Sequence, residues 1–232
     1  MIGSISFLDT RTHADLLPGF SNVSMEEVSR TITASPTKSC SIYPIPTRIL
    51  KKVSLLFVPT ITSIVNLSLQ IGVFPRVFKH GLITPLLKKP KLDKEVLSNY
   101  RPVTNLLFVS KVLERIVSKQ LDIHLSTHDI LSPAQSAYFR PHHRTETALL
   151  ALQSDLLQAA SHGNGCVVLL LDLNAAFDTI DHEILLDRLS ANCGIRGKPL
   201  AWIASYLTKR TQTVVIGGVA SEPVEVKWCP PP

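Results

Sequence analysis

The amino-acid sequence predicts a mixed α/β (α+β) protein, and three observations support that class. Apolar residues recur every three to four positions from Val109 to Leu125, as in a helix with one buried face. Short alternating or wholly apolar runs at residues 80–87, 101–105 and 166–171 are typical of strands. With 45% hydrophobic residues, the 232-residue chain can build a core as one large domain or two small ones.

The N-terminal part is expected to be helical. Residues 24–27 (Ser-Met-Glu-Glu) form a capping box, which predicts a short helix to about Ala34. Pro46 and Pro59 stand where first-turn prolines of two further helices would lie. Gly72 fits as the C-terminal stop of the second of these helices.

The middle of the chain predicts a hairpin followed by two helices. Residues 80–87 and 101–105 have strand character on either side of a charged loop at residues 88–97. The strongest helical pattern covers residues 110–127. A second helix is expected at residues 145–161, after a connector that contains prolines.

The C-terminal part predicts helices and paired strands. A helix should run from His182 to about Asn192, with Asp181 as its N-cap. Another helix begins near Pro199. Residues 211–216 and 224–228 alternate like paired strands around a Gly-Gly turn.

The chemistry of the chain is concentrated after residue 166. An apolar run of strand length delivers Asp172 at its end, and a carboxylate at the mouth of a buried strand usually requires a compensating cation. Phe177 and Asp178 follow beyond a turn of small residues. The plain alternative is a strand end followed by the helix cap Asp181. That alternative does not explain why Asp172, Phe177 and Asp178 occur together. A metal-dependent phosphoryl-transfer site is therefore one interpretation.

The positive charge is unevenly distributed. The net charge is +6, and residues 76–119 hold ten basic and three acidic side chains, so this segment is +7 and the remainder is −1. Concentrated positive charge indicates a polyanionic partner. A solvated helix face followed by a loop is the alternative explanation.

Other classes have little support in the sequence. We expect no signal peptide, no membrane-spanning helix and no membrane partner, because no basic and apolar leader or long apolar stretch stands out. The expected location is intracellular, in the cytoplasm, the nucleus or both. The four cysteines are scattered without a Cys-x-x-Cys pair, which disfavours zinc.

Six blocks along the chain carry a resemblance to a known family. They are residues 38–51 with Pro-Ile-Pro, 99–106 (Asn-Tyr-Arg-Pro-Val-Thr-Asn-Leu), 110–115 (Ser-Lys-Val-Leu-Glu-Arg), 135–149, 167–182 and 202–210 (Trp-Ile-Ala-Ser-Tyr-Leu-Thr-Lys-Arg). In this order they resemble the reverse transcriptases of LINE-type (non-LTR) retrotransposons, over roughly residues 16–227. The block at 167–182 is similar to the first catalytic motif of that family.

The sequence also departs from the family pattern. Tyr43 stands at a usual acidic position, and Arg144 and Asn174 replace usual serines. After Lys227 the family continues into a Gly-x-Pro-Gln-Gly loop and a Tyr-x-Asp-Asp hairpin, whereas this chain reads Trp-Cys-Pro-Pro-Pro. The resemblance therefore predicts a polymerase truncated before its second carboxylate motif.

The resemblance implies a right-hand polymerase fold with fingers and an incomplete palm behind a helix-rich N-terminal part. Residues 1–78 would be a helical extension upstream of the fingers, 79–161 the fingers, and 162–232 a partial palm with the first catalytic motif.

It also implies roles for individual residues. Asp172 matches the catalytic carboxylate and first metal ligand, and the backbone carbonyl of Leu173 would be a second ligand for Mg²⁺ or Mn²⁺. A complete two-metal site is not expected without the second motif. Phe177 matches the residue beneath the sugar of the incoming nucleotide, where a bulky ring favours deoxynucleotides.

The basic residues would hold phosphates. Lys89 (or Lys88) and Arg101 match fingers cations that grip a nucleoside triphosphate, and arginine suits this task because its planar fork donates paired hydrogen bonds. Contacts to nucleic acid are expected from Lys88, Lys91, Lys111 and Arg115. The partners implied are an RNA template, a DNA primer and deoxynucleoside triphosphates.

The resulting functional prediction is a fragment of an RNA-directed DNA polymerase that is inactive alone. One carboxylate cannot hold two dications, and losing such a group costs on the order of a thousandfold or more in rate. The alternatives are a non-catalytic nucleic-acid-binding remnant and a pseudogene product. An unrelated metal phosphohydrolase using Asp172, Asp178 and Asp181 is disfavoured, because no phosphate-cradling loop accompanies these residues.

Overall fold

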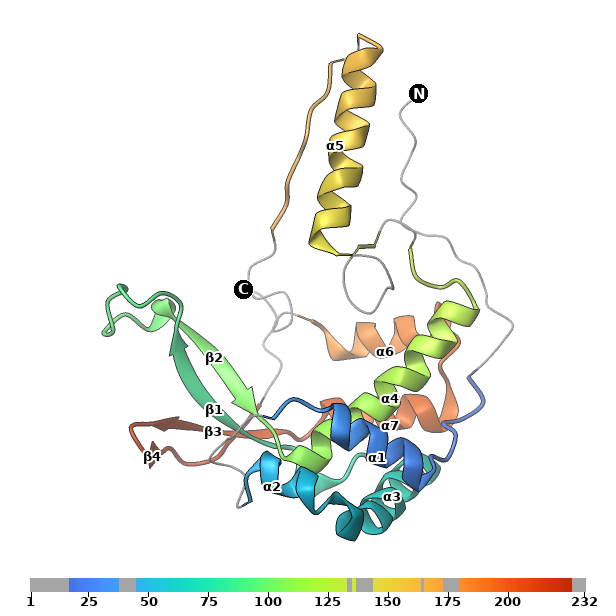
Figure 1. Cartoon of the computed structure of the whole chain (residues 1–232), viewed down its shortest axis with the longest axis vertical. Helices are drawn as coiled ribbons and strands as arrows, with labels where there is room; N and C mark the ends of the chain where they lie inside the picture. Colours follow the sequence, from blue (N-terminus) through green and yellow to red (C-terminus); the bar gives the residue numbers. More distant parts are fainter. Residues whose placement is uncertain are drawn as a thin grey trace.

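The computed structural model describes residues 17–37, 45–132, 135–136, 144–163, 165–172 and 180–226. Within these residues the helices are α1 (Met25–Ala34), α2 (Thr47–Lys52), α3 (Ser54–Ile71), α4 (Phe108–Thr127), α5 (Thr145–Ser161), α6 (His182–Ala191) and α7 (Gly197–Leu207). The strands are β1 (His80–Leu87), β2 (Tyr100–Asn105), β3 (Thr211–Ile216), β4 (Val219–Ala220) and β5 (Val224–Glu225). The helices α1 to α4, α6 and α7 gather on one side, the sheet extends from them, and α5 projects away (Figure 1). The predicted mixed α/β class is confirmed.

The first helices follow their local signals, with one exception. The Ser24 hydroxyl accepts a hydrogen bond from the amide of Glu27 and so caps α1 as predicted. Pro59 does not begin a helix, because α3 already starts at Ser54. Proline inside a helix removes the amide donor to the carbonyl four residues earlier, here that of Leu55, a residue that is 80% exposed.

The end of α3 depends on a glycine. Gly72 has a φ of +70° and caps the helix in the left-handed conformation, as predicted. A Cβ atom at this position would lie 2.9 Å from the carbonyl oxygen of Lys198 in α7. The two helices approach this closely only because residue 72 has no side chain.

Contrary to expectation, one helix is long and apolar enough to cross a membrane. By length and composition alone, the 18 residues of α3 meet that criterion. One third of these residues are buried, among them Val58, Val65 and Leu69 of the protein core. A single helix of this kind is weak evidence for a membrane.

The strands form one mixed sheet in the order β2-β1-β3-β4, with β5 also paired to β3. Strands β1 and β2 make the predicted antiparallel hairpin, with Leu86 opposite Arg101. Strand β3 pairs in parallel with the first half of β1, from His80 opposite Thr211. The predicted strand at residues 211–216 is formed as β3, and β5 pairs with its start as expected. The Gly-Gly turn joins β3 to the two-residue strand β4, which was not predicted.

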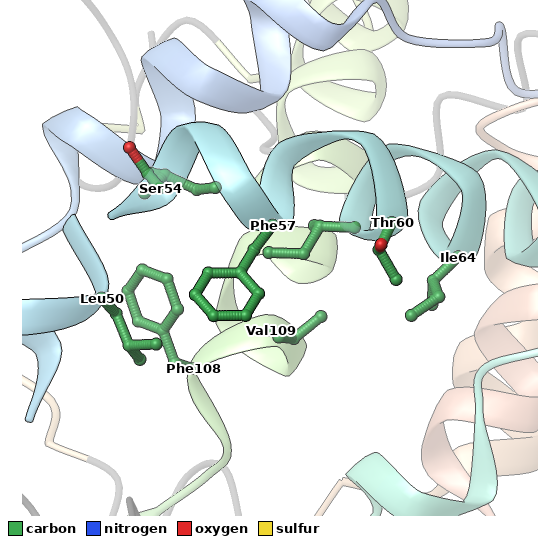
Figure 2. Close-up of a pocket in the computed structure, with 9 residues that line it drawn as sticks. Leu50, Ser54, Phe57, Thr60, Ile64, Phe108 and Val109 are labelled. Atoms are coloured by element: carbon green, nitrogen blue, oxygen red, sulfur yellow. The ribbon is translucent and has the colours of Figure 1, made fainter. Parts of the chain in front are cut away.

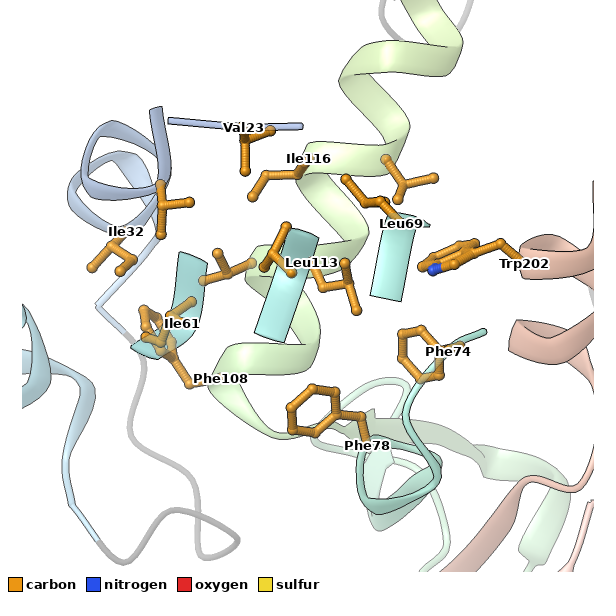
Figure 3. Close-up of a cluster of buried hydrophobic side chains, with 14 of the residues drawn as sticks. Val23, Ile32, Ile61, Leu69, Phe74, Phe78, Phe108, Leu113, Ile116 and Trp202 are labelled. Atoms are coloured by element: carbon orange, nitrogen blue, oxygen red, sulfur yellow. The ribbon is translucent and has the colours of Figure 1, made fainter. Parts of the chain in front are cut away.

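The core surrounds one face of α4 (Figure 3). Val112 and Leu113 of α4 have no exposed surface, and they belong to one cluster that runs from Val23 before α1 to Ile203 in α7. Trp202 of α7 donates its indole N–H to the Ser68 hydroxyl of α3 at 2.9 Å. The cluster thus contains residues from all three segments predicted from the sequence (1–78, 79–161 and 162–232). The boundaries of these segments stay a prediction.

A polar cluster joins α4 to the end of α7. The half-buried carboxylate of Glu114 accepts a hydrogen bond from the Ser110 hydroxyl at 2.7 Å. Burial raises the pKa of the Glu114 carboxyl, while its hydrogen bond with Ser110 and the charge of Arg210 oppose that rise. The Arg210 guanidinium lies 4.7 Å from the centre of the Tyr206 ring and donates to the Tyr206 carbonyl oxygen at 3.0 Å.

We expect Leu113→Ala to lower the free energy of unfolding by about 2–5 kcal/mol, because it leaves a cavity in a fully buried position. Urea denaturation measures this change. The matched control is Ile123→Ala on the same helix, whose side chain is 57% exposed and whose loss should cost about 0.5 kcal/mol. Equal effects from the two variants would contradict the position of the core.

Glu114 also gives a pH-dependent prediction. Since its pKa is raised above the ordinary value of 4.5, the folded chain holds this proton more tightly than the unfolded chain. The associated stability is complete below that value and is lost as the pH rises through the folded-state pKa. The unfolding free energy of the wild type should therefore fall relative to Glu114→Gln between acidic and neutral pH. Urea denaturation at several pH values measures this difference. If the unfolding free energies of the two proteins changed with pH in parallel, the pKa of Glu114 would not be raised.

Candidate nucleic-acid interface

The loop between β1 and β2 is held in one shape by its own hydrogen bonds. The Lys88 amide donates to the Asn99 carbonyl at 2.8 Å, and the Lys88 ammonium donates to the Ser98 carbonyl at 2.8 Å. The Asn99 side chain donates to the Asp93 carbonyl at 2.9 Å, and the Tyr100 hydroxyl donates to the Lys94 carbonyl at 3.1 Å. The loop is therefore a rigid support for the charges that it carries.

This hairpin brings several predicted phosphate-binding residues together. Lys88, Lys89, Lys91 and Lys94 are exposed on the loop, and Arg101 is exposed on β2. Because Arg101 lies opposite Leu86, the two side chains emerge on the same face of the sheet. Leu86 is 60% exposed, so this face combines a cation with apolar surface, which suits a polyanion that also carries flat bases.

Lys111 and Arg115, the two residues of α4 predicted to contact nucleic acid, lie outside the hairpin. The Arg115 guanidinium donates a hydrogen bond to the hydroxyl of Ser35, the buried residue that follows α1. Lys111 is half-buried near the start of the same helix. Arg115 therefore has a structural partner that the sequence did not reveal, and its role in binding nucleic acid stays a prediction.

The buried strand expected before Asp172 is not formed. Residues 165–172 are extended but belong to no strand, and the side chains of Val167 and Leu171 are 95% and 84% exposed. A strand requires a neighbour for its backbone groups and cover for its side chains. Among the described residues no strand pairs with this segment. Asp172 accordingly lies exposed at its end.

No metal site is formed within the described residues. This part of the chain contains no group of three or more acidic, histidine or cysteine side chains that could hold a metal ion, at Asp172 or elsewhere. Leu173, Phe177 and Asp178 lie outside the described residues. The predicted roles of Leu173 as a metal ligand and of Phe177 as a contact to the sugar stay predictions.

A second group of cations was missed by sequence reasoning. Lys79 precedes β1, exposes only 8% of its surface, and donates to the carbonyl of Thr208 at the end of α7 at 3.2 Å. Burial lowers the pKa of the Lys79 ammonium, and the neighbouring charges of Arg210 and Lys209 lower it further. The cluster arises from residues about 130 positions apart, so no local pattern could predict it.

An apolar pocket among the helices has a different character (Figure 2). It has a volume of about 230 Å³ and lies among α1 to α4, with Leu50, Phe57, Ile64 and Phe108 in its wall. Its lining holds no charged side chain, and the hydroxyls of Ser54 and Thr60 are its only side-chain polar groups. It therefore offers nothing that would bind a phosphate.

Comparison with known proteins assigns the chain to a family. Residues 87–229 match the family described as reverse transcriptase (RNA-dependent DNA polymerase). The chain is 27% identical over 72% of its length to the probable RNA-directed DNA polymerase from transposon BS of Drosophila melanogaster, and 27% identical over 87% to the RNA-directed DNA polymerase from mobile element jockey of the same organism. It is 30% identical over 54% of its length to the retrovirus-related Pol polyprotein from the type-1 retrotransposable element R2 of Popillia japonica.

These matches cover 18%, 22% and 17% of the three relatives, so the chain spans about a fifth of their length. The family match nevertheless includes more than half of this chain, the loop lysines and Asp172. The resemblance to polymerases of non-LTR retrotransposons is thus confirmed, and the chain belongs to the reverse transcriptase (RNA-dependent DNA polymerase) family.

Proposed function

We propose that this chain is part of an RNA-directed DNA polymerase of a non-LTR retrotransposon and that its β1–β2 hairpin binds RNA template, DNA primer and deoxynucleoside triphosphates. The ordered hairpin, with four exposed loop lysines and Arg101 on one strand, carries the proposal. Lysine ammonium groups act as point charges toward phosphate, whereas the arginine fork fixes the orientation of a phosphate through paired hydrogen bonds. A support that is already rigid loses little entropy when it binds.

Asp172 has the second role in the proposal. Reverse transcriptases as a family use divalent metal ions, and we assign Asp172 and the backbone of Leu173 as ligands of one Mg²⁺ or Mn²⁺. Since Asp172 alone does not make a metal site, the chain by itself is expected to be inactive. We place the protein inside the cell, in the cytoplasm, the nucleus or both.

A non-catalytic nucleic-acid binder is the second candidate. The observation that favours it is the contrast between the ordered basic hairpin and the exposed, unpaired segment before Asp172. Both candidates require nucleic-acid binding, and only the polymerase requires Asp172.

For binding, we expect the affinity for a template–primer duplex to fall linearly with salt on logarithmic axes. The double variant Lys89→Glu/Lys91→Glu should weaken binding at least tenfold and reduce the slope by about 0.9 for each phosphate that it no longer neutralises. Fluorescence anisotropy at several salt concentrations measures both quantities. Arg30→Ala is the control, because Arg30 is exposed on α1 and pairs with Glu26. Salt-independent binding by the wild type would exclude the proposed interface.

For catalysis, we expect no primer extension by this chain alone with Mg²⁺. A chimera that joins residues 1–226 to the downstream segment of the jockey polymerase should extend a primer on RNA. In that chimera Asp172→Asn should lower the rate on the order of a thousandfold or more. Asp187→Asn on α6, an exposed position, is the matched control. Extension that survives Asp172→Asn would remove Asp172 from the catalytic machinery.

A further inference from the structure

Three cations meet where α7 ends and strands β1 and β3 begin. The parallel pairing of the strands places His80 opposite Thr211, and the Thr211 amide donates to the Lys79 carbonyl at 3.3 Å. This register brings Lys79 beside Lys209 and Arg210, the two residues that precede β3.

The local anionic groups do not balance these cations. Lys79 and Arg210 donate to the last carbonyls of α7, and a helix C-terminus is equivalent to about half a negative charge. The Glu114 carboxylate acts on Arg210 but does not form an ion pair with any of the three within the described chain. Even when Glu114 carries a full negative charge, the positive charge of the three cations exceeds the local negative charge, because the helix terminus adds only about half a unit.

One of these cations is exposed. Lys209 has a φ of +53°, a conformation that non-glycine residues rarely adopt, and its side chain is exposed. An exposed cation therefore neighbours the nearly buried Lys79. Because burial and its two neighbours lower the pKa of Lys79, an anion that arrives here would relieve an existing repulsion.

We infer that Lys79, Lys209 and Arg210 form a second phosphate-binding site, which holds the backbone of a bound nucleic-acid strand at the base of the sheet. The inference rests on the proposed function of the hairpin. Lys79 and Lys88 flank the eight residues of β1 and are nine residues apart, so about 30 Å separates them at about 3.3 Å per residue. A nucleic-acid strand can span this length, whereas one nucleoside triphosphate reaches only one of the two groups.

The test is the salt dependence of RNA binding by wild type, Lys209→Ala and Lys198→Ala. The RNA is single-stranded and long enough to follow the whole sheet. Lys209 makes no side-chain hydrogen bond or ion pair within the described chain, so its alanine variant should fold normally, and melting curves check this. Lys198 is an exposed lysine near the other end of α7 and serves as the matched control.

We expect Lys209→Ala to weaken binding several-fold and to reduce the logarithmic salt slope by about 0.7, the value for one phosphate of a single strand. Lys198→Ala should change neither. An unchanged slope in Lys209→Ala would overturn the site, and so would an equal loss in Lys198→Ala.

Two further outcomes separate the possible sources of phosphate and the two proposals. In a parallel titration with deoxyadenosine triphosphate, a loss of affinity in Lys209→Ala without any change in the RNA slope would assign the site to free nucleotide and overturn the assignment to nucleic acid. Failure of the wild type to bind RNA at all would remove the proposed function together with this site. If the hairpin variants still weaken RNA binding while Lys209→Ala does not, only the second site is lost.

Discussion

The burial of one face of α4 is the constraint on which the rest of the structure depends. Val112 and Leu113 are fully buried, and burying one leucine side chain contributes about 1.5–3 kcal/mol. The same helix is tied to the end of α1 through Arg115 and to the end of α7 through the charge on Glu114. Strand β2 ends only three residues before α4 begins, so the direction of the basic hairpin is set by the packing of this helix.

The parallel pairing of β1 with β3 is the second long-range constraint. It joins residues 131 positions apart, and the aromatic rings of Phe74, Trp202 and Tyr206 pack edge-to-face or stacked beside it. Such pairing forms only after the intervening chain has been closed into a loop, at a cost that grows slowly with its length. The hairpin and the end of α7 thereby become parts of one unit, which places two groups of cations on one sheet.

The sequence predicted the elements that local chemistry determines. The cap at Ser24, the strand at residues 80–87 and the helix at residues 145–161 all occur where they were expected. The errors involve tertiary partners. Pro59 is accommodated inside α3 by an exposed turn, and the run at residues 166–171 forms no strand because a strand requires a neighbour. The Lys79 cluster could not be predicted, because only the β1–β3 register brings its members together.

The basic hairpin and the segment that carries Asp172, the two parts of the proposed site, depend on different parts of the fold. The loop of the basic hairpin is held by its own hydrogen bonds, and the hairpin is anchored by β3 and the adjoining core, so its charges are in place within the described chain. Asp172 ends an apolar segment whose side chains remain exposed, and its burial would require a further strand. The proposed binding and catalytic roles are therefore separable: the basic surface proposed to bind phosphates is already formed in the described chain, whereas burial of the segment before Asp172 would require a neighbour that pairs with it.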